Sequence, residues 1–124
     1  MLVKKRILVV DDSPPILELA TTMLKLLGYE PVKASTGVEA LKILSEEELD
    51  MALLDVMLPD MDGFKICAHI RSSDKFADMP VIMLSAKKTG EDVEKGLKVG
   101  ANEYLTKPFK SAELAELIKI YIGE

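Results

Sequence analysis

Short runs of apolar residues alternate five times with longer segments in which apolar residues recur at helical spacing. The short runs predict strands at residues 6–10, 31–34, 51–54, 81–85 and 103–105. The longer segments predict helices over residues 15–27, 37–46, 63–72, 89–99 and 111–122. Strand and helix in regular alternation indicate an α/β fold, in which a parallel sheet is covered by helices on both faces.

The content of each predicted strand indicates its position in the sheet. The first, third and fourth strands are apolar runs, as expected for the centre of a parallel sheet. The second strand contains Pro31 and Lys33, and the fifth is short and begins with Glu103, so both suit an edge. Right-handed crossovers then give a five-stranded sheet in the order 2-1-3-4-5, the doubly wound, flavodoxin-like arrangement.

Acidic residues stand directly after two of the predicted central strands. Asp11 and Asp12 follow the first strand, and Asp55 follows the third. The chain reverses direction between these strands, and ligands bind at such a point, beyond the carboxyl ends of the strands. Each close carboxylate pair there repels by roughly 3–4 kcal/mol at an effective dielectric constant of ~20. Such a cluster favours a hard cation such as Mg²⁺ between the carboxylates.

Composition and charge narrow the classes of function. A chain of 124 residues with 48% hydrophobic residues suits one folded domain, over residues 1–124, and argues against disorder. Its net charge of -5 argues against a nucleic-acid surface. Cys67 has no second cysteine to pair with, which favours a reducing compartment, and no segment has the length of a membrane span. We therefore expect a cytoplasmic protein that contacts neither nucleic acid nor membrane.

Four motifs, in order along the chain, resemble those of the response regulator receiver domains of two-component signalling, the CheY-like family. They are Asp11-Asp12, the run DVMLPDMDG over residues 55–63, Ser85-Ala86 and Lys107-Pro108-Phe109. The match covers essentially the whole chain. The resemblance implies a signalling module that accepts a phosphoryl group from a sensor histidine kinase or a phosphotransfer protein. It also implies that the module passes the signal to a downstream effector protein or a fused output domain.

The resemblance implies a role for each acidic residue. Asp55 corresponds to the phosphoacceptor, whose carboxylate attacks the phosphoryl group on a partner's histidine. Asp11 and Asp12 correspond to the pair that holds Mg²⁺, for which Mn²⁺ is a substitute, Asp12 directly and Asp11 through water. Asp55 and the backbone carbonyl of Met57 complete the expected metal ligands. The competing interpretation is that one of the first two acids caps the following helix, although Ser13 is an alternative cap.

The resemblance implies further roles at the ends of the fourth and fifth strands. Lys107 corresponds to the lysine that neutralises charge on the transferred phosphoryl oxygens, after a cis peptide bond to Pro108 has set the turn. Ser85 corresponds to the hydroxyl that hydrogen-bonds the attached phosphoryl group, and Tyr104 to an aromatic switch that turns inward with it. The competing interpretations are a solvated lysine, a strand-end hydroxyl and an ordinary edge aromatic.

For three other residues near these motifs, the sequence gives weaker indications of a functional role. Met57 and Lys87 stand two residues after Asp55 and Ser85, at positions that vary in the family. They either tune the lifetime of the phosphoryl group or are simply exposed. His69 shares a helix face with charged residues, so we expect a surface residue there rather than a phosphohistidine or a metal ligand.

The predicted helix over residues 89–99 is the expected switch element. Its apolar anchors are chiefly Val93 and Leu97, and it contains Gly96, which costs ~1 kcal/mol relative to alanine in a helix. Weakly held elements supply switching surfaces. We expect this helix, the fifth strand and the last helix to form the output face. Ile120 and Ile122 would then be available to a partner, or to a phosphorylation-dependent dimer.

Other functions remain as alternatives at this point. A flavodoxin-like cofactor binder needs a phosphate-binding loop where Asp11 and Asp12 stand, and two acids repel phosphate. A Mg²⁺-dependent phosphohydrolase that works through an aspartyl phosphate needs a cap or a further domain. A scaffold-type receiver that is not phosphorylated usually lacks an acid or the lysine, and this chain has kept them all. We therefore do not expect an enzyme, beyond catalysis of its own phosphorylation and dephosphorylation.

The sequence leaves several properties open, because they depend on partners. These are the cognate kinase, the regulated process, the phosphoryl lifetime and the oligomeric state. It also leaves open whether the chain acts alone or is an excised domain of a longer protein.

Overall fold

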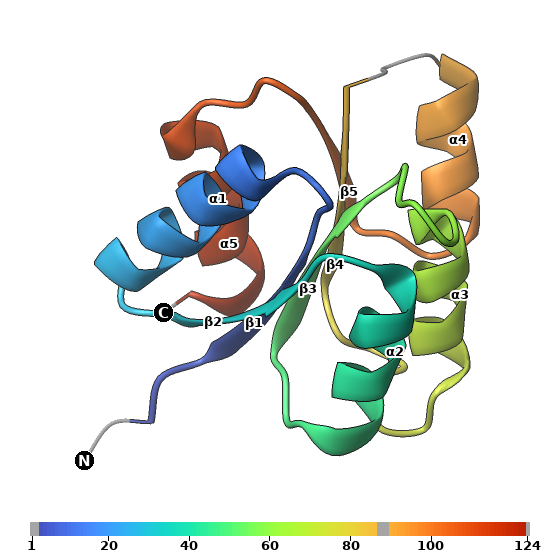
Figure 1. Cartoon of the computed structure of the whole chain (residues 1–124), viewed down its shortest axis with the longest axis horizontal. Coiled ribbons are helices and arrows are strands. Elements are labelled where there is room, and N and C mark those ends of the chain that lie inside the picture. The colour runs from blue at the N-terminus through green and yellow to red at the C-terminus, as the bar shows by residue number, and fades with distance from the viewer. Residues whose placement is uncertain (1–2, 87–89, 124) are drawn as a thin grey trace.

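The computed structural model describes residues 3–86 and 90–123, which form a five-stranded parallel sheet with helices on both sides (Figure 1). The strand order is β2-β1-β3-β4-β5, so the predicted order is confirmed. Both predicted edge strands lie at the edges. The strands are β1 (Arg6–Val10), β2 (Glu30–Ala34), β3 (Met51–Asp55), β4 (Val81–Ser85) and β5 (Glu103–Thr106).

Helices α1 and α5 cover one face of the sheet, and α2, α3 and α4 cover the other (Figure 1). Three of the five predicted helices have the expected bounds, and α1 begins and ends one residue earlier. The predicted start of the fourth helix, at residue 89, lies outside the described residues. The helices are α1 (Pro14–Leu26), α2 (Gly37–Glu46), α3 (Gly63–Ser72), α4 (Gly90–Lys98) and α5 (Ser111–Ile122).

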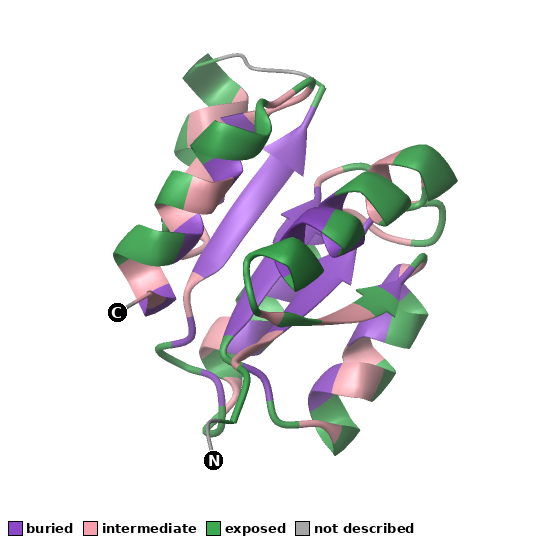
Figure 2. Ribbon diagram, turned by 90° about the vertical axis from the view of Figure 1, so that its left-hand side faces the viewer, coloured by how far each residue is buried: buried purple, intermediate pink, exposed green. Residues whose placement is uncertain are grey.

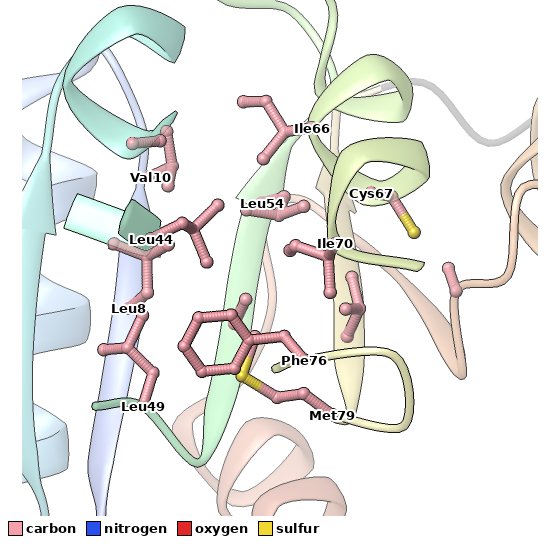
Figure 3. Close-up of a cluster of buried hydrophobic side chains, with 14 of the residues drawn as sticks. Leu8, Val10, Leu44, Leu49, Leu54, Ile66, Cys67, Ile70, Phe76 and Met79 are labelled. Atoms are coloured by element: carbon pink, nitrogen blue, oxygen red, sulfur yellow. The ribbon is translucent and has the colours of Figure 1, made fainter. Parts of the chain in front are cut away.

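The central strands are buried on both faces, which explains their continuous apolar sequence (Figure 2). Along β1, Ile7 and Val9 pack toward α1 and α5, whereas Leu8 and Val10 pack toward α2 and α3. Successive side chains of a strand point to opposite faces, so one apolar run supplies both cores. Figure 3 shows the second of these cores, where side chains of β1, β3 and α3 meet.

Two expectations about apolar helix positions are wrong. Leu97 is 52% exposed and does not anchor α4 to the sheet. Ile122 is 8% exposed and packs in the core beneath α5, so it is not available to a partner, whereas Ile120 is 65% exposed as expected. Helical spacing by itself does not determine which apolar residues a helix buries, because the neighbouring elements determine the covered face.

The sheet brings the ends of its central strands to one edge. β1 pairs with both β2 and β3, and β3 extends one residue further than predicted, so that Asp55 itself pairs with Leu84 of β4. β5 pairs with β4, with Thr106 opposite Ser85. The carboxyl ends of β1, β3, β4 and β5 therefore lie at the same edge of the sheet, together with the predicted site residues that end or follow these strands. Among the described residues, no helix is long and apolar enough to cross a membrane.

Candidate functional site

Three carboxylates gather at the carboxyl edge of the sheet. Asp55 is the last residue of β3, and Asp11 and Asp12 follow β1 directly. One oxygen from each of the three can be chosen so that all lie within 4.8 Å of one another. Asp11 is fully buried, Asp55 is 6% exposed and Asp12 is open to solvent. The acidic cluster predicted from the strand ends is thus present in the fold.

Lys107 reaches this cluster from the end of β5, the edge strand that pairs with β4. Its Nζ lies 2.5 Å from Asp11 Oδ2 and 3.4 Å from Asp55 Oδ2. The backbone of Lys107 continues the pairing of β5 with β4, because its N–H donates to the carbonyl of Ser85 at the end of β4. This pairing places the lysine beside the cluster. The peptide bond between Lys107 and Pro108 is cis, as expected. A solvated lysine is therefore the wrong interpretation.

The electrostatics of the cluster disfavour the ionised form of its central acid. Burial raises the pKa of Asp55, and the nearby Asp11 raises it further. The ammonium of Lys107 and the backbone N–H of Met57 counteract this rise in the pKa of Asp55, but only in part. Asp55 is therefore a carboxyl group that an added cation would help to ionise.

The donor set fits a divalent cation. Three carboxylates and one ammonium leave a formal charge of −2, which follows from Asp11, Asp12, Asp55 and Lys107 at neutral pH. Carboxylate oxygens are the side-chain ligands that Mg²⁺ prefers, and Mg²⁺ keeps several waters beside them. The exposed Asp12 leaves one side of the cluster open to such waters. Mg²⁺ would be held by these three acids.

Neither of the proposed caps completes the first turn of α1. Ser13 occupies the N-cap position, as the alternative interpretation expected, but its side chain makes no capping hydrogen bond. Asp11 Oδ1 instead accepts from the backbone N–H of Ser13 at 2.9 Å. This bond orients the Asp11 carboxylate, whose other oxygen faces Lys107.

The loop between β3 and α3 is held tightly at both ends. The N–H of Gly63 donates to the carbonyl of Val56 at 2.7 Å, and Met57 and Asp62 form a bridge across the loop. A Cβ atom at Gly63 would collide with the backbone carbonyl of Asp55, which explains the glycine at the start of α3. The side chain of Met57 is 62% exposed on this loop.

The expected switch residues lie on neighbouring strands. Ser85 ends β4 and is 3% exposed, beside the acidic cluster. Tyr104 lies on β5, half-buried against the core shared by α2 and α3. Lys87 lies outside the described residues. His69 is exposed on α3, as expected for a surface residue.

Sequence reasoning missed two residues of this region. The side-chain oxygen of Thr106 is buried without a hydrogen-bond partner among the described residues, next to Lys107. Asp60, in the β3–α3 loop, accepts hydrogen bonds from two backbone N–H groups of α2. An aspartate in a loop is usually solvated, and no periodic pattern marks a contact between two segments that lie 22 residues apart.

Comparison with known proteins agrees with this geometry. The family model of the response regulator receiver domain matches residues 7–119. The transcriptional regulatory protein GltR of Pseudomonas aeruginosa is 46% identical over 115 residues, which are 93% of this chain and 48% of that protein. The chain thus spans about half the length of this curated relative.

Solved structures with the same fold are also similar in sequence. The chemotaxis protein CheY4 of Vibrio cholerae matches with a TM-score of 0.92 and 30% identity, over 97% of this chain and 100% of that one. The receiver domain of the sensor histidine kinase PA1611 of Pseudomonas aeruginosa matches with a TM-score of 0.89 and 34% identity, over 98% and 100% of the two chains. That structure has a magnesium ion coordinated in its active-site cleft.

Proposed function

Since the chain belongs to the response regulator receiver domain family, we propose that it is a phosphorylation-dependent switch, with Asp55 as the phosphoacceptor and Mg²⁺ as the cofactor. Residues 1–124 would form one receiver domain. The observation that carries the proposal is the cluster of Asp11, Asp12 and Asp55 within 4.8 Å, with Lys107 against two of them. A scaffold that is never phosphorylated has no need of so costly an arrangement of buried charge.

The arrangement suits transfer of a phosphoryl group to a carboxylate. An oxygen of Asp55 attacks phosphorus, the new O–P bond forms as the P–N bond to the donor histidine breaks, and the electron pair stays on the imidazole nitrogen. A bound Mg²⁺ supplies positive charge to the phosphoryl oxygens. Lys107, 3.4 Å from Asp55, pairs with a phosphoryl oxygen once transfer begins. The hydroxyl of Ser85 then donates to the attached group.

Receiver domains are signalling modules, and they are generally not classed as enzymes. The family assignment also argues against the alternative interpretation of the chain as a flavodoxin-like cofactor binder. The alternative of a Mg²⁺-dependent phosphohydrolase with a separate substrate is tested by the experiment below. Its signature would be turnover of many phosphoryl groups without a stable product on the protein.

The first experiment is intact mass spectrometry after incubation with acetyl phosphate and Mg²⁺. We expect one added phosphoryl group, which Asp55→Asn and removal of Mg²⁺ both abolish. Lys107→Ala should slow the gain roughly 100-fold or more, while the exposed Lys42→Ala serves as its matched control. Absence of any gain in the folded, Mg²⁺-bound protein would contradict the proposal for this donor and require a test with a histidine kinase.

The output of the switch is proposed to be the face formed by α4, β5 and α5. Phosphorylation adds a charge of about −1.5 to −2 at Asp55, which must bias an element with two arrangements. Among the described residues of α4, Gly96 alone is buried, and a Cβ there would lie 3.3 Å from both Phe64 and Tyr104. Such a helix can shift together with Tyr104 without loss of a large core.

Amide hydrogen exchange tests this output face. With a phosphoryl mimic such as beryllofluoride bound, we expect changed exchange in residues 90–106 and unchanged exchange in β1 and β3. Exchange that is unaltered in the segment from α4 through β5 would contradict the proposed switch, even if Asp55 accepts a phosphoryl group.

The proposed partners follow from the family. The curated relative is a transcriptional regulatory protein, and one similar structure is a receiver domain of a sensor histidine kinase. We propose a histidine kinase or phosphotransfer protein as donor, and an effector protein or a fused output domain as recipient of the signal. We also predict that phosphorylation produces a dimer through α4, β5 and α5, and that the protein is cytoplasmic.

A further inference from the structure

The β3–α3 loop, which follows the proposed phosphoacceptor, is docked on the first turn of α2. Asp60 Oδ1 accepts from the backbone N–H of Gly37 at 2.8 Å, and Asp60 Oδ2 accepts from the N–H of Val38 at 2.9 Å. One carboxylate therefore binds two successive N–H groups of a helix to which it is not adjacent in sequence.

These two N–H groups have no satisfactory local partner. The first N–H groups of a helix lack intrahelical acceptors. The hydroxyl of Thr36 accepts from the N–H of Glu39, and the Glu39 side chain accepts from Ser35, so the local capping residues serve the third helical position and the residue before the cap. Asp60 serves the first two helical positions. Those two bonds lower the pKa of Asp60, which stays ionised at the positive end of the helix dipole.

A second contact sets the position of the loop along α2. The side chain of Met61 packs directly on Gly37, where an added Cβ atom would collide with it. Polar and apolar contacts from two successive loop residues thus converge on one helical turn. The loop has little freedom to slide over α2 while both contacts persist.

The same stretch of chain also holds the other half of the acidic cluster. The carbonyl of Ala34, the last residue of β2, accepts from the backbone N–H of Asp11 at 3.1 Å. Three residues later, Gly37 binds Asp60. The connection from β2 to α2 therefore braces both the end of β1, which carries Asp11, and the loop that follows Asp55.

We propose that Asp60 is a positioning residue for the metal and phosphoryl site. By holding the middle of the β3–α3 loop on α2, it keeps the backbone at Met57 in the position that a metal bound to Asp11, Asp12 and Asp55 requires. This inference rests on the proposed function, because it concerns the Mg²⁺ of that function. Both carboxylate oxygens of Asp60 bind α2 rather than face the acidic cluster, so Asp60 would act through the loop.

A matched pair of variants tests the proposal. Asp60→Ala and Thr36→Ala each remove one capping interaction from the same helix end, and both should lower stability. Of the two residues, only Asp60 is part of the β3–α3 loop. In an NMR titration with Mg²⁺ alone, we expect Asp60→Ala to bind Mg²⁺ ~10-fold more weakly, as for other supporting residues around a metal, and Thr36→Ala to bind it normally.

Two further readouts separate positioning from general destabilisation. Amide exchange in residues 56–62 should accelerate in Asp60→Ala and stay at the wild-type rate in Thr36→Ala. Phosphorylation by acetyl phosphate should need more Mg²⁺ in Asp60→Ala but reach close to the wild-type rate at saturating Mg²⁺. Asp60→Asn retains one carbonyl acceptor without the charge, so it should fall between Asp60→Ala and wild type in all three measurements.

Equal Mg²⁺ affinity in folded Asp60→Ala and wild type would overturn the proposal, as would an equal loss in Thr36→Ala. If the wild-type protein itself bound no Mg²⁺, the proposed function would fail rather than the loop contact. The contact would then be judged by exchange alone. Unchanged exchange of residues 56–62 in Asp60→Ala would overturn it.

Discussion

Helices α3 and α4 cover the same face of the sheet, but they are held to it very differently (Figure 1). α3 buries Phe64, Ile66, Cys67 and Ile70, in addition to the glycine at its start. Asp62 caps α3, accepting from the N–H of Lys65. Among the described residues of α4, Gly96 alone is buried, and both Val93 and Leu97 retain exposed surface. The sheet face is thus covered by one helix that belongs to the core and by one, poorer in apolar residues, that rests on its surface.

The difference shows how one fold can combine rigidity with a switch. α3 begins where the β3–α3 loop ends, so the core that holds α3 also holds the loop beside Asp55. α4 approaches α3 and β5 closely at Gly96, and the Nζ of Lys95 lies 5.0 Å from the centre of the Phe64 ring. An element with so little buried apolar surface can move at low cost.

The largest expected effect concerns the well-anchored helix. Ile70→Ala removes a fully buried side chain from the core under α3, so we expect a loss of about 2–5 kcal/mol in the free energy of unfolding. Urea denaturation followed by circular dichroism measures this loss. A loss below about 1 kcal/mol would show that α3 is no better anchored than α4.

A smaller effect, of opposite sign, is expected at the acidic cluster, which lies beside the start of α3. The pKa of Asp55 is raised in the folded state, so ionised Asp55 destabilises the metal-free fold at neutral pH. Asp55→Asn should therefore raise stability by on the order of 1 kcal/mol in metal-free buffer. Because a raised folded pKa means that stability is lost as pH rises through it, this gain should fade toward acidic pH.

Thermal unfolding of the two proteins between pH 3 and pH 8 measures the gain, with a chelator present. A gain that grows as the pH falls would contradict the assigned direction of the pKa shift. Addition of Mg²⁺ should stabilise wild type more than Asp55→Asn, because ligands stabilise the state that binds them.

The next effect concerns the close approach of α4. Gly96→Ala gains helix propensity worth up to ~1 kcal/mol, but the new Cβ would lie 3.3 Å from Phe64 and Tyr104, which must shift slightly. We expect the two contributions largely to cancel, leaving stability within about 0.5 kcal/mol of wild type. NMR shifts of Tyr104 should nevertheless change, whereas those of Val9 should not.

The smallest expected effect is the counterpart of the first. Leu97→Ala truncates a side chain that is 52% exposed on α4, so we expect a change within about 0.5 kcal/mol. The same urea titration measures it beside Ile70→Ala. Equal losses in the two variants would remove the distinction between a core helix and a surface helix.

Much of the candidate site could be predicted because it follows from strand ends. Apolar runs that end in Asp11, Asp12 and Asp55 must place these acids at one edge of a parallel sheet, and the structure brings them within 4.8 Å. The contact of Asp60 with α2 could not be predicted in this way. It depends on how a loop folds back over a helix 22 residues away, for which the sequence has no periodic signal.

The sequence by itself determined the alternation of strands and helices, the strand order and the edge at which the acids gather. These properties follow from local patterns of apolar residues and from the handedness of crossovers, which apply to any chain of this pattern. Only the tertiary structure decided that Leu97 is exposed, that Ile122 is buried, and that Lys107 binds Asp11 and Asp55. Burial and ion pairing depend on which elements pack together, and those partners are distant in sequence.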